Sequence, residues 1–336
     1  MQTARNSAPP NSGGARATFA GVMMELPTCL ECVASSGRGT GWSLPLAGVD
    51  DEEGERVDPT LPAVVDAHVH LFPDPLFEAI WRWFDVHGWP IRYKLKTPDV
   101  VRFALARGVG HVVALHYAHK PGIARGMNAF MAEVVRSEPR VSGMATVMPG
   151  EPDARRILED AFASGLTGVK LHCHVQCFAP DSPELTEIYE TCVAHDMPLV
   201  MHAGREPKSS GYKCDPHALC HVDRTEAVLR AHPKLRLVVP HLGADELAGY
   251  ARLLERHDNL WLDTTMALAG YFEDAERAFR MVEARPDRIM YGTDFPNIPY
   301  AWDRELRRIG ARRLPDAALA SVLGDNARAF YRIAVQ

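Results

Sequence analysis

The chain of 336 residues has no apolar run of the roughly 18 residues that a membrane-spanning helix requires. Its Lys and Arg residues are spread along a chain with a net charge of −6, so no basic patch marks a nucleic-acid or membrane surface. The start lacks the charged and then apolar pattern of a secretory signal. The seven cysteines lack the even number and spacing of a disulfide framework. We therefore expect a cytoplasmic protein.

Two kinds of binding motif are also missing. No GxGxxG or GxxxxGK(S/T) follows an apolar run, which argues against the nucleotide sites that these loops form. Cys29 and Cys32 form a single CxxC, and without a second one we interpret them as ordinary thiols. Both lie in residues 1–60, which are rich in Gly, Ser, Pro and Ala and include the acidic run "DDEEGE". This composition predicts a disordered N-terminal arm.

In residues 61–336 short apolar runs alternate regularly with amphipathic segments. Segments such as "DARRILEDAFASG" and "SPELTEIYETCVAHD" have apolar residues three and four apart and Asp or Ser near their starts, which predicts capped helices. Eight such strand–helix units favour a parallel (β/α)8 TIM barrel over an open doubly wound sheet. The predicted strands are 63–70, 110–117, 141–148, 168–175, 197–203, 235–242, 260–265 and 288–294.

Polar residues stand late in these runs. In "VVDAHVHLF" the side chains of Asp66, His68 and His70 alternate along a strand and share one face. The carboxyl ends of barrel strands converge on one face, so we expect the strand-end residues to meet in one pocket. Burying this many polar groups without partners would cost free energy, and a bound divalent metal would supply the partner. Imidazoles and a carboxylate are suitable ligands for a metal such as zinc. The other strand-end residues are Lys170, His172, His174, His202, His241, Asp263 and Asp294.

The motifs "DAHVH", "MHAG", "VPHLG" and "YGTDFP", in this order, resemble the amidohydrolase superfamily, in particular its amidohydrolase-2 branch. The ending "NARAFYRI" is similar to that of the branch. The resemblance implies a distorted (β/α)8 barrel with one catalytic divalent metal, with zinc as the favoured ion and manganese or iron as alternatives. It implies His68, His70, His202 and Asp294 as ligands. It also implies His241 as a residue beside the metal that contacts the substrate. Asp294, which would touch both metal and water, is the expected catalytic base.

Asp66 has two readings, since it could orient one of the ligating histidines or bond to backbone near the barrel floor. Other amidohydrolases carry a carbamylated lysine on the fourth strand, but we favour a substrate-binding role for Lys170, together with His172 and His174. The loop after the fifth strand, residues 204–226, is unusually long and basic. Its Arg205 is the candidate for holding a substrate carboxylate. The same loop carries Cys214, His217, Cys220 and His221, either as packed side chains of a lid or as a structural zinc site.

These residues predict a metal-dependent hydrolase that cleaves an amide, lactone or ester in a small, carboxylate-bearing molecule. The alternative is a non-oxidative decarboxylase of an unsaturated or aromatic acid, because the same branch contains such enzymes with a similar metal shell. A barrel that binds metal without catalysis is disfavoured. A purely structural metal would have all four coordination positions filled by Cys or His, whereas this set includes the proposed base Asp294 and its partner His241. The expected partner is a small-molecule substrate, and a homodimer is left open.

Overall fold

The computed structural model describes residues 51–206, 208–270 and 275–334. Most of the predicted N-terminal arm lies outside the described residues, as do Cys29 and Cys32. The part of the arm that is described contacts the barrel. Arg92 Nη2 donates to Glu53 Oε2 at 3.1 Å, and Gly54 N donates to Asp303 Oδ2 at 3.0 Å. The domain boundary at residue 60 stays a prediction.

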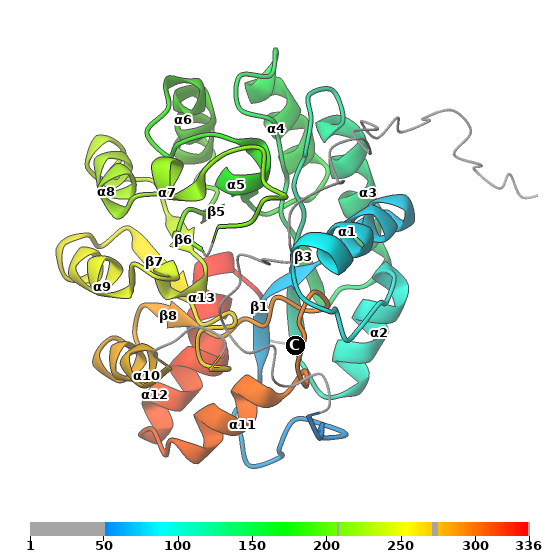
Figure 1. The fold of residues 1–336 in the computed structure, drawn as a ribbon, viewed down its shortest axis with the longest axis vertical. Coiled ribbons are helices and arrows are strands. Elements are labelled where there is room, and N and C mark those ends of the chain that lie inside the picture. The colour runs from blue at the N-terminus through cyan, green and yellow to red at the C-terminus, as the bar shows by residue number, and fades with distance from the viewer. Residues whose placement is uncertain (1–50, 207, 271–274, 335–336) are drawn as a thin grey trace, which may run out of the picture. The chain divides into compact units, whose positions relative to one another are not determined.

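Eight parallel strands in the described part of the chain form the predicted barrel (Figure 1). They are β1 (Val65–His70), β2 (His111–Leu115), β3 (Val141–Gly143), β4 (Val169–His172), β5 (Leu199–His202), β6 (Leu237–Val239), β7 (Leu260–Asp263) and β8 (Ile289–Met290). Strands β1 to β3 pair in sequence order, and so do β4 to β8. A bridge between Ala145 and Val169 joins the two sheets at β4, and a bridge between Val69 and Phe295 joins them at β1. The ring of strands is thereby closed.

Helices surround the strands and follow them in chain order (Figure 1). The α-helices are α1 (Asp74–His87), α2 (Thr97–Ala106), α3 (Ala124–Ser137), α4 (Ala154–Ala163), α5 (Cys173–Gln176), α6 (Thr186–Ala194), α7 (Pro216–Leu219), α8 (Val222–Ala231), α9 (Leu247–Arg256), α10 (Ala275–Ala284), α11 (Arg304–Ala311), α12 (Asp316–Ala320) and α13 (Asn326–Tyr331). Three further turns are η1 (Pro183–Leu185), η2 (His241–Gly243) and the π-helical η3 (Ser321–Asp325).

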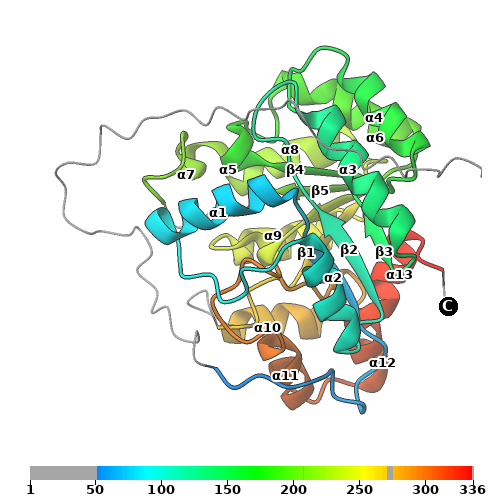
Figure 2. The same ribbon diagram turned by 90° about the vertical axis from the view of Figure 1, so that its right-hand side faces the viewer.

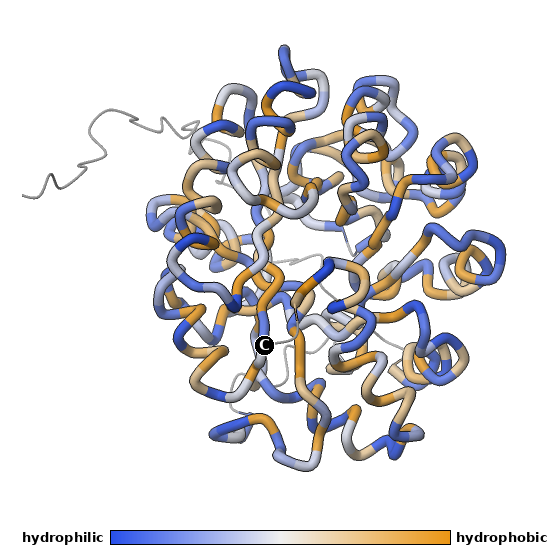
Figure 3. Tube along the Cα trace, turned by 180° about the vertical axis from the view of Figure 1, so that it is seen from behind, coloured by the Kyte–Doolittle hydropathy of each residue, from blue (hydrophilic) through white to orange (hydrophobic). Residues whose placement is uncertain are grey.

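Helix α4 illustrates the helical pattern. It buries Ala154, Ile157, Leu158 and Ala161, the spacing of one helical face. In Figure 3 hydrophilic and hydrophobic residues alternate along the peripheral helices in the same way. The predicted cap at Asp153 is wrong, because this residue adopts a left-handed φ of 61° and its side chain makes no capping hydrogen bond. No helix in the described ranges combines the length and apolar character needed to cross a membrane.

Helix α13 lies at one end of the strands, while α1, α5 and α7 lie at the other end (Figure 2). Phe330 and Tyr331 of α13 pack in one buried cluster with Val65 and Ala67, which belong to the first half of β1. The amino ends of the strands are thus filled with apolar side chains, and this burial is the main source of stability there. The carboxyl ends are left for polar residues.

Candidate metal centre

A first donor group consists of His68, His70 and Asp294. Asp294 Oδ1 lies 3.3 Å from His68 Nε2 and 3.0 Å from His70 Nε2. The donor atoms of all three residues lie within 4.8 Å of one another. His68 and His70 end β1, and Asp294 comes four residues after β8, at a φ of 69°. Its backbone N donates to His68 O at 2.9 Å, which holds it beside β1.

Asp263, at the end of β7, fixes the orientation of His68. Its Oδ2 accepts a hydrogen bond from His68 Nδ1 at 2.8 Å. The proton then resides on Nδ1, so the lone pair of Nε2 faces the carboxylate of Asp294. Burial, assisted by the nearby charge of Lys170, lowers the pKa of His68 to about 4. A neutral imidazole held in this way is suited to ligate a metal.

Asp66 has a structural role. It accepts hydrogen bonds from the backbone N of His68 at 3.1 Å and from Thr293 Oγ1 at 2.6 Å. It also accepts from Thr293 N at 3.1 Å, so it ties β1 to the segment after β8. Burial raises the pKa of Asp66 to about 7. Of the two readings of Asp66, the structure favours backbone support, and Asp263 is the acid that orients an imidazole.

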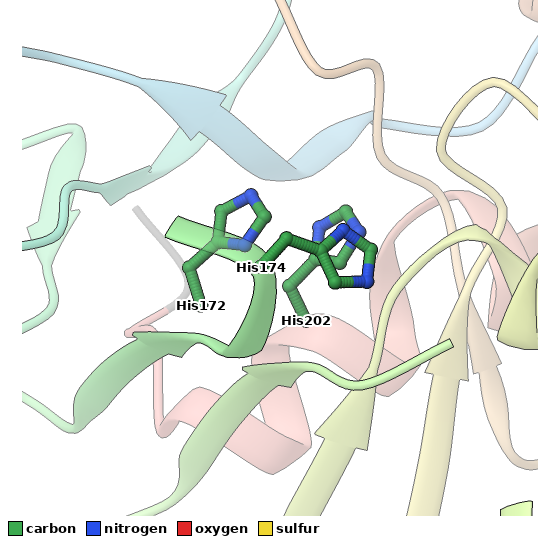
Figure 4. Close-up of side chains that lie close together, drawn as sticks. All are labelled: His172, His174 and His202. Atoms are coloured by element: carbon green, nitrogen blue, oxygen red, sulfur yellow. The ribbon is translucent and has the colours of Figure 1, made fainter. Parts of the chain in front are cut away.

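A second donor group consists of His172, His174, His202 and Glu206. His172 and His202 are paired neighbours at the ends of β4 and β5, and their rings stack at 4.1 Å with an interplanar angle of 6°. The donor atoms of His172, His174 and His202 lie within 4.8 Å of one another (Figure 4). Glu206, on the loop after β5, places Oε1 2.5 Å from His202 Nε2 and Oε2 3.4 Å from His174 Nδ1.

The pKa values in this second group reflect its burial. Burial lowers the pKa of His202 to about 3. Burial alone would raise the pKa of Glu206. The charges and hydrogen bonds of His202 and His174 have the larger effect and hold that pKa well below its usual range. Burial also opposes the charge of His174, but Cys220 and Glu206 raise its pKa to about 10. The group therefore holds a buried carboxylate against several imidazoles.

The sequence predicted a strand over 168–175 that places His174 on the same face as Lys170 and His172, and for His174 this is wrong. Strand β4 ends at His172, because Gln176 Oε1 accepts the hydrogen bond of His172 N at 2.8 Å and the chain turns into α5. His174 therefore projects from a helix. Its ring still lies 5.5 Å from that of His172, so the two residues remain neighbours.

Lys170 is buried among these groups. Its Nζ has no hydrogen-bond partner in the described part of the chain. Burial lowers its pKa to about 8, while the carboxylates of Asp263, Asp294 and Glu206 oppose that shift. A buried ammonium without a partner is costly, which favours an anion close to it.

His241 lies between the two donor groups, and its donor atom lies within 4.8 Å of those of His202 and Glu206. It belongs to η2 at a φ of 57°, and its backbone N donates to Asp263 Oδ1 at 3.1 Å. Its Nδ1 contacts Thr265 O at 2.9 Å, and its Nε2 contacts His202 Nδ1 at 3.3 Å. Its ring centroid is 5.9 Å from that of His68. His241 thus stands beside the first donor group, in contact with the second.

Arg205 is directed elsewhere. Its Nε lies 3.3 Å from Asp245 Oδ1 and 3.4 Å from Glu246 Oε2. The structure therefore does not bring Arg205 into the histidine cluster, because two carboxylates hold its guanidinium.

The cysteines and histidines of the same loop do not converge either. His217 Nε2 donates to Glu206 O at 2.8 Å, and Cys214 Sγ donates to His174 O at 3.3 Å. His221 accepts from Asp223 N at the start of α8. Among the residues that the structure describes, Cys214, His217, Cys220 and His221 belong to no group of converging donors. The packed-lid reading of Cys214, His217, Cys220 and His221 is the one that the structure favours.

Sequence reasoning missed Glu206. Its one signal is its place four residues after His202, in a loop longer than a connection requires. Among the four ligands implied for one metal, the structure groups three, whereas His202 lies with Glu206. Buried imidazole nitrogens without hydrogen-bond partners, His68 Nε2 and His172 Nδ1 among them, together with carboxylates fit a divalent metal.

Solved structures with this fold include enzymes with bound metals. A TIM-barrel protein from Bordetella bronchiseptica is 17% identical with a TM-score of 0.62, covering 80% of this chain and 98% of its own. A 5-carboxyvanillate decarboxylase from Novosphingobium aromaticivorans, complexed with manganese and 4-hydroxy-3-methoxy-5-nitrobenzoic acid, is 16% identical with a TM-score of 0.59, covering 84% and 100%. An amidohydrolase from Burkholderia multivorans with bound zinc is 17% identical with a TM-score of 0.58, covering 81% of this chain and 100% of its own.

These likenesses show the fold. A family model described as amidohydrolase matches residues 65–333, from the first residue of β1 to two residues beyond α13. The match takes in both donor groups and most of the chain, and this protein therefore belongs to the amidohydrolase family.

Proposed function

We propose that this chain is a metal-dependent hydrolase that cleaves an amide, lactone or ester in a small, carboxylate-bearing molecule. The observation that carries the proposal is the convergence of His68, His70 and Asp294 within 4.8 Å at the carboxyl ends of the strands. The family is metal-dependent, and zinc is the favoured ion, with manganese or iron as alternatives. His202 stays a predicted fourth ligand, although its Nε2 faces Glu206.

A divalent metal at this place supplies a Lewis acid that lowers the pKa of water from 15.7 to about 7. Asp294 is placed to accept the proton of the attacking water, because its Oδ1 contacts both His68 Nε2 and His70 Nε2. Its hydrogen bond to His70 and the neighbouring imidazoles outweigh burial and hold the pKa of Asp294 below its usual range. Asp294 is therefore ionised and ready to ligate.

His241 is the group proposed to hold or move the second proton of the reaction. Its Nδ1 is fixed by the carbonyl of Thr265, so its Nε2 side is the reactive one. That side contacts His202 Nδ1 at 3.3 Å, which links it to the second donor group. A proton can therefore pass between the imidazoles without a change of backbone conformation.

Lys170 is the residue proposed to bind the substrate carboxylate. Its buried Nζ lacks a hydrogen-bond partner among the described residues, and a carboxylate would compensate its desolvation. His172 and His174 contribute neighbouring donors. Arg205 is a weaker candidate than the sequence suggested, because Asp245 and Glu246 hold it.

A decarboxylase of an aromatic acid is the second candidate, and an aromatic wall beside the first donor group favours it. The ring of Phe72 stacks on His70 at 5.6 Å, and Tyr117 meets His70 edge-on at 5.9 Å. Tyr117 also lies 5.0 Å from the ring of His172. Such a wall suits a flat ring. The manganese-bound decarboxylase of the same fold shows that this architecture accommodates the reaction in that protein.

The two functions are separated by their products. The metal-loaded chain is incubated with a panel of lactones, esters and amides that bear a carboxylate, and with matched aromatic acids, and carbon dioxide is recorded throughout. We expect hydrolysis without release of carbon dioxide. We also expect the hydrolytic activity to be lost in Asp294→Asn. Release of carbon dioxide from an aromatic acid, with no hydrolysis of any panel member, would replace the hydrolase by the decarboxylase. A cytoplasmic location and the oligomeric state remain predictions.

A further inference from the structure

The β5–α7 loop, which is the chain between these two elements, contacts α1 on one side and α5 on the other. Trp83 Nε1 of α1 donates to Gly211 O at 3.3 Å, and the ring of Tyr212 lies 5.3 Å from that of Trp83. The same Tyr212 ring lies 5.3 Å from that of His174 in α5. Both helices lie at one end of the strands (Figure 2). The loop therefore bridges α1 and α5 beside the donor groups.

Two thiols meet where this loop reaches α5. Cys214 Sγ of the loop donates to His174 O at 3.3 Å, and Cys177 Sγ donates to the same oxygen at 3.7 Å. The two thiols also form a hydrogen bond with each other. Sulfur atoms that touch each other and share one acceptor need only side-chain rotations to reach the bonding distance of a disulfide.

The backbone at Cys177 is unusual. This residue ends α5 at a φ of 56°, in the left-handed region where glycine is the usual residue. Its side chain is exposed and that of Cys214 is half-buried, so burial in the core does not explain a cysteine at this strained position. Strain of this kind points to a function for the residue.

A second pair of thiols crosses the same junction but is closed to reagents. The side chain of Cys220 forms a hydrogen bond with that of Cys173, and both residues are buried. Exchange with an external disulfide requires access to the attacking sulfur. The outer pair, Cys177 and Cys214, is therefore the reactive one, and the inner pair provides an internal comparison.

We propose that Cys177 and Cys214 form a reversible disulfide that fastens the β5–α7 loop to α5, with a small disulfide such as oxidised glutathione as the oxidant. Cys177 loses its proton, and its thiolate attacks one sulfur of the oxidant, whose S–S bond breaks and releases one small thiolate. Cys214 then loses its proton and attacks the sulfur of Cys177, which releases the second small thiolate. Two protein thiols are oxidised, one small disulfide is reduced, and the two protons pass to the released thiolates.

The order of the two steps follows from the surroundings of Cys214. Burial, together with the contact with Cys177, raises the pKa of Cys214 to about 12, so this thiol is a poor first nucleophile at neutral pH. A mixed disulfide at Cys177 removes the thiol charge that contributes to this shift. Cys214 is then suited to the second step, which is intramolecular and gains from proximity.

Peptide mapping tests the bond. The reduced full-length chain is incubated with oxidised glutathione, its remaining thiols are alkylated, and it is digested with trypsin. Cys177 falls in peptide 171–205 and Cys214 in peptide 214–224, whereas Cys29 and Cys32 share a third peptide. We expect peptides 171–205 and 214–224 to be joined, with the loss of two hydrogens, and to separate after dithiothreitol.

Variants assign the bond to its two sulfurs. Cys177→Ser and Cys214→Ser should each abolish the joined peptides. Cys220→Ala is the matched control, because Cys220 lies in the same peptide as Cys214 and its removal leaves the outer pair intact. Joined peptides that persist in Cys214→Ser and disappear in Cys220→Ala would assign the bond to Cys173 and overturn the proposal. The absence of joined peptides from the unaltered chain would overturn it as well.

Trypsin digestion of the native chain tests whether the bond fastens the loop. Lys213 is exposed and directly precedes Cys214, so cleavage after Lys213 requires the loop to open locally. Oxidation should slow this cleavage at least about 5-fold in the unaltered chain and leave it unchanged in Cys214→Ser. Cleavage after Lys94, which is exposed between α1 and α2, is the internal control. Equal rates after Lys213 in the oxidised and reduced chains would contradict the fastening. Neither measurement requires a substrate, so the proposal stands apart from the proposed function.

Discussion

The carboxylate of Glu206 lies 2.5 Å from Nε2 of His202, which stands four residues earlier in the chain. This contact turns His202 towards the loop after β5. The end of β5 therefore belongs to a cluster of its own, joined to the first donor group through His241. A barrel expected to hold one metal thus presents two neighbouring sets of donors.

Asp263 should be needed for tight metal binding although it is not proposed as a ligand. Its Oδ2 holds the Nδ1 proton of His68, and Asp263→Asn would leave that tautomer unsupported. We expect the affinity of the first donor group for zinc to fall about 10–100-fold, the usual cost of losing such support. A competition titration with a zinc-binding dye measures this. Asp316→Asn, an exposed acid of α12, is the control, and equal affinities in both variants would exclude the orienting role.

Asp294→Asn should separate metal retention from turnover. The amide keeps the size of the side chain and one oxygen for ligation, but it cannot accept the proton of the attacking water. We expect zinc to be partly retained while turnover falls by about 10²–10⁴-fold, the range for a positioned acid–base group. Zinc analysis and the rate on whichever substrate is found test this together. Turnover within a few fold of the unaltered enzyme would remove Asp294 as the base.

His241→Ala should leave the zinc of the first donor group in place, because His241 lies beside that group. Turnover should fall by about 10²–10⁴-fold through the loss of a positioned imidazole. Loss of the first zinc in His241→Ala, to the same extent as in His70→Ala, would make His241 a ligand instead.

The floor of the barrel should be sensitive to packing. Phe330 is 4% exposed and packs in the cluster with Val65 and Ala67. We expect Phe330→Ala to lower the free energy of unfolding by about 3–5 kcal/mol, as for other buried aromatic residues. Urea unfolding measures it, with Val86→Ala as the control because Val86 is 61% exposed. A loss below about 1 kcal/mol for Phe330→Ala would mean that α13 does not close the core.

A chain that begins at Glu55 should retain its metal and the fold, since both donor groups lie in the barrel. It should unfold slightly earlier than a chain that begins at Asp51, because it lacks the contacts of Asp51 with Arg304 and of Glu53 with Arg92. These half-buried pairs contribute about 0.2–1 kcal/mol each. Thermal unfolding of the two chains compares them, and an insoluble or metal-free product would make residues 51–54 part of the domain.

The eight strands and their order could be predicted because each one is a short, buried run of apolar residues between amphipathic helices. The meeting of His68, His70 and Asp294 followed from barrel geometry, since carboxyl ends converge. The role of Glu206 could not be predicted, because a long loop has no periodicity that tells where a side chain points. The role of Asp263 in orienting His68 escaped for another reason. Strand alternation places a side chain on a face but does not decide its hydrogen-bond partner.

The position of the metal in a crystal tests the proposed catalytic centre most directly. Crystals of the zinc-loaded chain are measured with X-rays on both sides of the zinc absorption edge, so that only zinc contributes to the difference. We expect an anomalous peak at about 2.0–2.2 Å from His68 Nε2, His70 Nε2 and Asp294. No peak at the first donor group, or a single peak bound elsewhere, would contradict the assignment of the catalytic metal.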